Sequence, residues 1–167
     1  MMKNETGFSL IELMIVIAII ATMSIAGVAG WYGFMPSYRL RTAVDDLQAT
    51  MQMARLKAVK ENAMTTVRFT GTNTYTVFID ADEDGTLDSG EEVFLTRTLP
   101  PGISLFAATD AGFAQYNSRG FPESGAMSFR LRNGKGQFLG IRMEASGAFS
   151  IQTSSTGAAG TWADQYD

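Results

Sequence analysis

The chain contains near its N-terminus, from Gly7 to Phe34, the stretch GFSLIELMIVIAIIATMSIAGVAGWYGF. Beyond Glu12 this stretch has no Asp, Glu, Lys or Arg. A helix of about 20 apolar residues is long enough to cross the roughly 30 Å hydrocarbon layer of a membrane. We therefore expect residues 8–35 to form a membrane-spanning helix that organises the rest of the chain.

The seven residues before this stretch are short and polar, and they read MMKNETG. A secretory signal peptide has its small-residue cleavage site after the apolar segment. Here the pair Gly7-Phe8 precedes the apolar segment instead. A cut between these two residues would leave the apolar helix in the mature protein.

The order Gly7-Phe8-Ser9-Leu10-Ile11-Glu12, followed by apolar residues, resembles the N-terminal signal of type IV pilins and type II secretion pseudopilins. The resemblance implies that a prepilin peptidase removes residues 1–7 and methylates the new N-terminal Phe8. It implies a single-pass protein of the inner membrane, with its C-terminal domain outside the cytoplasm, that later enters a pilus or pseudopilus. The implied partners are other pilin or pseudopilin subunits, the peptidase and an inner-membrane assembly platform.

Glu12 is the one acidic residue of the apolar stretch. A carboxylate at the middle of a membrane helix costs roughly 2.5–3.5 kcal/mol, so it usually has a partner. The resemblance implies an assembly role, in which the Phe8 amine of a neighbouring subunit pairs with Glu12 and sets the axial register. In the alternative interpretation Glu12 only reaches the membrane surface near the helix end.

A second helical pattern follows Pro36, which is expected to end or kink the first helix. Apolar residues then recur at spacings of three and four, namely Leu40, Val44, Leu47, Met51, Ala54 and Ala58. This period predicts an amphipathic helix over 36–62 with one buried face. That face needs a partner, and the strands that follow are the candidate.

The remaining chain has the pattern of β-hairpins. Strands are predicted over 65–70, 74–80, 92–99, 127–132, 137–144 and 148–153, while 107–126 is expected to be irregular and 154–167 a flexible tail. The predicted fold is α+β, with a long N-terminal helix packed through its second half on an antiparallel sheet domain over 63–153. This arrangement is the lollipop shape of pilins, and Gly120-Phe121-Pro122 adds to a resemblance with the FimT/GspH group of minor pseudopilins.

An acidic segment follows the second predicted strand and reads DADEDGTLDSGE from Asp80 to Glu91. Its spacing matches the twelve-residue calcium loop of an EF-hand, with carboxylates at alternate positions before a glycine. The candidate Ca²⁺ ligands are Asp80, Asp82, Asp84, the carbonyl of Thr86, Asp88 and Glu91. An EF-hand loop joins two helices, whereas this segment joins two predicted strands, so an acidic hairpin tip without an ion is the alternative. Ca²⁺ is the only cofactor suggested, and none is required.

Alternation along the predicted strands places four basic residues on one outer face, namely Arg130, Arg132, Lys135 and Arg142. Some FimT-like minor pilins bind DNA through arginines in their C-terminal part, although their Gly-Arg-x-Arg type of motif is absent here. A DNA-binding minor pilin of a competence pilus is therefore the alternative function. A solvated sheet face is the more ordinary interpretation.

Composition limits the chemistry of this chain. Its 167 residues carry a formal net charge of −4 and include no Cys and no His. Disulfides, thiolate metal sites, Cys nucleophiles and imidazole bases are thereby excluded. No recognisable motif pairs a nucleophile with a base, so the sequence predicts a structural subunit and no enzyme.

Overall fold

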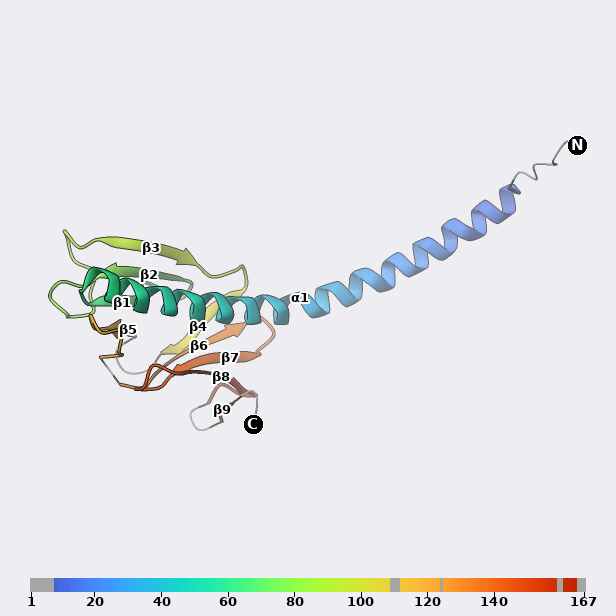
Figure 1. Cartoon of the computed structure of the whole chain (residues 1–167). Coiled ribbons are helices and arrows are strands. Elements are labelled where there is room, and N and C mark those ends of the chain that lie inside the picture. Colours follow the sequence, from blue (N-terminus) through green and yellow to red (C-terminus); the bar gives the residue numbers. More distant parts are fainter. Residues whose placement is uncertain (1–7, 109–111, 124, 159–160, 165–167) are drawn as a thin grey trace, which may run out of the picture. The chain divides into compact units, whose positions relative to one another are not determined.

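The computed structural model describes residues 8–108, 112–123, 125–158 and 161–164. Its first element is the helix α1, which extends over Leu10–Glu61 and is shown in blue to teal in Figure 1. The chain divides into two compact units, residues 1–35 and Pro36–Asp167. Within the described residues, no helix combines the length and the mean hydropathy that crossing a membrane requires.

The helix is continuous through Pro36. The alternative that Pro36 ends the helix is therefore wrong. Proline removes one backbone hydrogen bond from a helix interior, and the buried face that follows supplies packing to offset this loss. That face consists of the predicted stripe together with Ala43, and its members are Leu40, Ala43, Val44, Leu47, Met51, Ala54 and Ala58.

Two antiparallel sheets follow the helix. The first has the order β3-β2-β1-β5, built from β1 (Thr65–Phe69), β2 (Thr74–Ile79), β3 (Val93–Thr98) and β5 (Phe113–Tyr116). The second has the order β4-β6-β7-β8-β9, built from β4 (Ile103–Ala108), β6 (Met127–Asn133), β7 (Phe138–Met143), β8 (Phe149–Ser154) and β9 (Ala163–Asp164). The predicted α+β class with antiparallel strands is confirmed.

The strands differ from the prediction in three places. There are two sheets where one was expected, and β4 and β5 extend into the segment 107–126 that was expected to be irregular. Where the sequence predicts a flexible tail, β9 pairs with β8 through Gln152–Asp164 and Thr153–Ala163. Strands of two to four residues, or with Ala at their ends, give too weak a local signal to be recognised.

One hydrophobic core joins the helix to both sheets. Residues of α1 share a single buried cluster with residues of β1, β2 and β5 in one sheet and of β4, β6 and β7 in the other. Figure 1 shows residues 36–61 of α1 lying across the two sheets. The largest fully buried side chains include Tyr116, Phe129 and Leu47. The second half of α1 is thus an integral part of the globular unit.

Candidate functional site

The N-terminal candidates lie at the start of α1. Gly7 lies outside the described residues, while Phe8 precedes the helix and is 82% exposed. Glu12 lies in the first turn of α1, where a carboxylate interacts favourably with the positive end of the helix dipole. Nothing within the described chain covers Phe8 or Glu12, since every residue from 8 to 25 is exposed.

The apolar surface of this helical segment is extensive. Side chains that are normally buried are more than half exposed here, for example Ile11, Leu13 and Met23. The hydroxyl groups in the segment are satisfied internally, because Thr22 Oγ1 donates to Ile19 O at 2.9 Å and Ser24 Oγ donates to Ile20 O at 2.8 Å. A surface of this kind suits an apolar environment or other helices better than water.

The acidic loop, defined as Asp80–Glu91, connects β2 to β3. Its two ends meet where Ile79 N donates to Glu92 O at 3.0 Å. Asp80 is 1% exposed, and its Oδ2 accepts hydrogen bonds from Thr66 Oγ1 at 2.6 Å, Gln115 Nε2 at 2.8 Å and Gly85 N at 2.9 Å. Asp80 therefore anchors the loop to strands β1 and β5.

The structure brings together three of the six predicted ligands. One carboxylate oxygen from each of Asp80, Asp82 and Asp84 lies within 4.8 Å of the other two. Glu91 instead accepts from backbone amides, with Oε1 bound by Ala81 N and Oε2 by Asp88 N, both at 2.8 Å. In this structure Glu91 thus closes the loop on itself.

The other two predicted ligands, Thr86 and Asp88, lie beyond the glycine of the loop. Thr86 N donates to Asp84 Oδ1 at 2.6 Å, and Thr86 Oγ1 accepts from Arg68 at 3.3 Å. Asp88 is exposed and donates its backbone amide to Glu91. Both residues shape the loop around the three clustered carboxylates.

Four residues that support this loop were not identified from the sequence. Thr66, Arg68, Phe113 and Gln115 lie on β1 and β5, far from the loop along the chain. Arg68 donates to Gly85 O and stacks 5.6 Å from the centre of the Phe113 ring. Thr66, a polar residue inside a predicted strand, was the available signal, because a polar group that is buried in a sheet requires a partner. Gln115 lies in the segment that was expected to be irregular, and it gave no such signal.

Two effects act together on the Asp82 carboxyl group, namely local desolvation and the negative charge of its neighbours. Although its side chain is exposed, local desolvation raises the pKa of Asp82 above its ordinary value, and the charges of Asp84, Asp88 and Glu91 raise it further. A backbone hydrogen bond at Asp84 acts in the opposite direction. The loop therefore holds its carboxylates against mutual repulsion.

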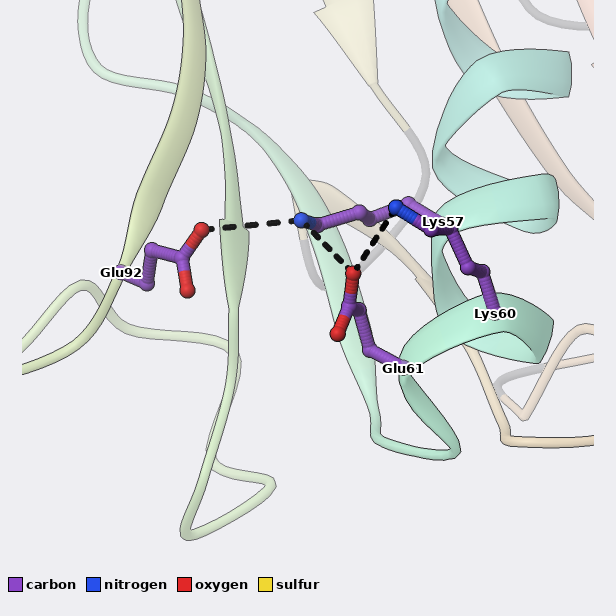
Figure 2. A network of polar contacts seen from close by, with 4 residues as sticks. All are labelled: Lys57, Lys60, Glu61 and Glu92. Atoms are coloured by element: carbon purple, nitrogen blue, oxygen red, sulfur yellow. Dashed lines mark hydrogen bonds and ion pairs between the residues drawn. The ribbon is translucent and has the colours of Figure 1, made fainter.

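A small ion-pair network joins the end of α1 to the residue that follows the acidic loop. Figure 2 shows Lys57 Nζ between Glu61 Oε1 at 3.1 Å and Glu92 Oε1 at 3.6 Å, with Lys60 also on Glu61. The hydrogen bond and charge of Lys57, followed by those of Lys60, lower the pKa of Glu61. Hydrogen bonding to Glu61 raises the pKa of Lys57, with the charge of Glu92 adding to the effect.

The basic face has the predicted orientation, with its arginines opposite a buried row. Phe129 and Leu131 are buried, while Arg132 and Arg142 are exposed and Arg130 is half-buried. Arg142 Nε pairs with Glu144 Oε1 at 2.8 Å, which offsets its charge.

Aromatic rings cover two of these cations. The guanidinium of Arg130 lies 4.9 Å from the centre of the Trp162 ring, and that of Arg132 lies 5.7 Å from the Phe106 ring. Lys135 is exposed in the β6–β7 turn, where its backbone amide donates to Asn133 Oδ1 at 3.0 Å. Stacking of this kind stabilises the sheet and is ordinary for surface arginines, so DNA binding stays a prediction.

Comparisons with known families give two matches along the chain. Residues 43–157 match the family described as type II transport protein GspH. Residues 2–28 match the prokaryotic N-terminal methylation motif. The two matches share no residues. The first lies in the globular unit, and the second includes the expected processing signal. No curated protein sequence gives a significant match.

Solved structures with a similar fold include a minor pilin and a minor pseudopilin. The type IV minor pilin FimU of Pseudomonas aeruginosa has a TM-score of 0.58 at 14% identity, covering 75% of this chain and 97% of FimU. The minor pseudopilin EpsH from the type 2 secretion system of Vibrio cholerae has a TM-score of 0.52 at 11% identity, covering 69% of this chain and 97% of EpsH. Because the GspH model covers more than half of the sequence, the chain belongs to the GspH family of type II transport proteins, and it is a structural subunit of the pilin and pseudopilin class rather than an enzyme.

Proposed function

We propose that this chain is a minor subunit of a type II secretion pseudopilus or a type IV pilus, and that it assembles through the first half of α1. The observation that carries the proposal is the coincidence of two features in one segment. The methylation motif covers residues 2–28, and the residues of that range whose exposure is described, 8–25, are exposed throughout and almost entirely apolar. A segment marked for processing and left uncovered by its own chain is suited to helix–helix assembly.

Processing at Gly7–Phe8 is the first step of the proposed pathway. A prepilin peptidase would cut after Gly7 and methylate the amine of Phe8. The exposed position of Phe8 before the first helical turn is compatible with access by an enzyme. The cut would place a positive amine four residues before Glu12, so the two groups of neighbouring subunits could pair in an apolar surrounding.

Helix packing is the second step. Apolar helices associate in a membrane through close contact, which small residues permit, and this segment provides Ala18, Ala21 and Ser24. The internal hydrogen bonds of Thr22 and Ser24 leave no hydroxyl in this part of the helix without a partner. In the proposed pathway the helix first lies in the inner membrane, with the globular unit outside the cytoplasm, and an assembly platform then transfers it into the filament.

Recovery from filaments tests this proposal. The full chain with a C-terminal epitope tag would be produced in cells that carry a complete pilin-type assembly system. We expect the tagged chain in the sheared filament fraction together with the major subunit, because minor subunits are incorporated into the same helical array. A tagged periplasmic protein of similar size serves as the control for carry-over.

The opposite distribution would contradict the proposal. If filaments are recovered at normal yield and the tagged chain stays entirely in the cell fraction, it is not a filament subunit. Comparison of a pilus with a secretion pseudopilus in this experiment also identifies which of the two machines accepts the chain.

A further inference from the structure

We propose that the acidic loop binds one Ca²⁺ ion through the side chains of Asp80, Asp82 and Asp84. This site goes beyond assembly through α1, because it lies on the globular unit and uses none of the residues 8–35. Two independent observations support it. One is the approach of three carboxylates to within 4.8 Å of one another. The other is an unpaired oxygen of the buried carboxylate among them.

The unpaired oxygen is Oδ1 of Asp80. The side chain of Asp80 is almost fully buried, yet Oδ1 has no hydrogen-bond partner among the described residues. Oδ2 of the same carboxylate already accepts three hydrogen bonds, from Thr66, Gln115 and Gly85. The oxygen that Asp80 can offer to the cluster is therefore Oδ1. A buried carboxylate oxygen without a partner is costly, and a cation bound beside Asp82 and Asp84 would satisfy it.

The cluster also lacks a neutralising side chain within the described part of the protein. The ion pairs found there involve Glu61, Glu92 and Glu144 and none of the three clustered carboxylates. Arg68 reaches the loop, but its guanidinium donates to the carbonyl of Gly85 and the hydroxyl of Thr86. No Lys or Arg of the described residues thus forms an ion pair with these three carboxylates, so a bound cation would supply the balancing positive charge.

The loop is pre-shaped for this role. Gly85 has φ of +73° and Glu83 has φ of +63°, so the chain turns sharply after the first two carboxylates. Glu91 ties Ala81 to Asp88 through both of its oxygens, which holds the ends of the loop together. The turn of the loop and the hydrogen bonds of Glu91 are therefore formed before an ion binds.

The ligand chemistry favours Ca²⁺. All three donors are carboxylate oxygens, and hard oxygen ligands with irregular geometry suit Ca²⁺, which takes six to eight of them and accepts water in the remaining positions. Mg²⁺ needs near-ideal octahedral geometry and keeps its water more strongly. With only three carboxylates on a strand-flanked loop, we expect a dissociation constant of about 10⁻⁴–10⁻³ M, in the range of extracellular calcium modules.

Thermal unfolding of the full chain in detergent micelles tests the site. Addition of about 10 mM CaCl₂ after treatment with EDTA is expected to raise the midpoint by about 5–10 °C, because an ion that binds only the folded state stabilises it. The variant Asp82→Ala, which has no oxygen ligand at this position, should lose this response. The Asp82 carboxylate is exposed and accepts a backbone hydrogen bond at Asp84, so this substitution removes a ligand, that one contact and a repulsive charge. The Ca²⁺ response of the variant is therefore measured against its own midpoint in EDTA.

Glu83→Gln is the matched control. It removes one negative charge from the same exposed loop, but Glu83 is outside the carboxylate cluster, so its Ca²⁺ response should equal that of the unmodified chain. Three results would overturn the proposal. They are no shift with CaCl₂, an equal shift in Asp82→Ala, and an equal shift with NaCl at the same ionic strength. Calorimetric titration with CaCl₂ should show one binding site, which is lost in Asp82→Ala.

Discussion

Leu47→Ala is expected to lower the free energy of unfolding by about 3–5 kcal/mol. Leu47 is fully buried in the cluster that joins α1 to both sheets. Shortening its side chain removes apolar contacts and leaves a cavity that the two sheets cannot close by moving together. A single domain is stable by about 5–15 kcal/mol in total, so this loss is a large share of the whole.

Leu56→Ala is the control for this prediction. Leu56 lies on the same helix and is 68% exposed, so its substitution should change the free energy of unfolding by less than about 0.5 kcal/mol. Urea denaturation of the full chain, followed by tryptophan fluorescence, measures both variants. Equal losses for Leu47 and Leu56 would show that the helix does not bury the predicted face.

Glu12→Ala is expected to reduce recovery of the chain in filaments by about a hundredfold. In the proposed assembly the carboxylate of Glu12 pairs with the Phe8 amine of a neighbour. Removal of Glu12 would leave that amine uncompensated among apolar helices, at roughly 2.5–3.5 kcal/mol, and about 1.4 kcal/mol corresponds to a factor of ten. The sheared filament fraction, compared with the total amount in the cell, measures the effect.

Asp45→Ala provides a matched control for Glu12→Ala. Asp45 is an exposed acidic residue on the same helix, outside the apolar segment, and its loss should leave recovery unchanged. Normal assembly of Glu12→Ala would show that Glu12 only reaches the surface of the membrane. The pairing with Phe8 would then be wrong, although the chain would still be a filament subunit.

The parts of the fold that were predictable from the sequence are those with a strong local period. Leu40, Val44 and Leu47 follow the helical spacing, and their burial agrees with it. The turn Asn133-Gly134-Lys135-Gly136 correctly placed the hairpin of β6 and β7. β5 was missed because it is short and pairs with β1, which is distant in sequence, whereas β9 was missed because it has only two residues.

The acidic loop shows the same limit at a candidate site. Its carboxylates lie close together along the chain, so their spacing is visible in the sequence itself. The partners of Asp80 are separated from it by 14 residues for Thr66 and by 35 for Gln115, and only the pairing of β1 with β5 brings them together. The local pattern therefore indicated that several carboxylates of this loop lie close together. They did not predict which carboxylate is buried or which oxygen is left unpaired.

The basic face gives a third example. Strand alternation correctly separated Phe129 and Leu131 from the arginines. It did not indicate that Trp162, in a segment expected to be a flexible tail, stacks on Arg130. A contact of this kind depends on where β9 returns along the edge of the second sheet, which no local pattern encodes.

The most direct test of the central claim is the mass of the mature N-terminal peptide. The chain would be isolated from the membrane of cells that have a prepilin peptidase, digested, and analysed by tandem mass spectrometry. We predict a mature protein that begins with N-methylated Phe8 and lacks residues 1–7, since the motif match covers residues 2–28. A chain that keeps its intact leader and begins at Met1 in such cells would contradict processing at Gly7–Phe8 and, with it, assembly as a pilin-type subunit.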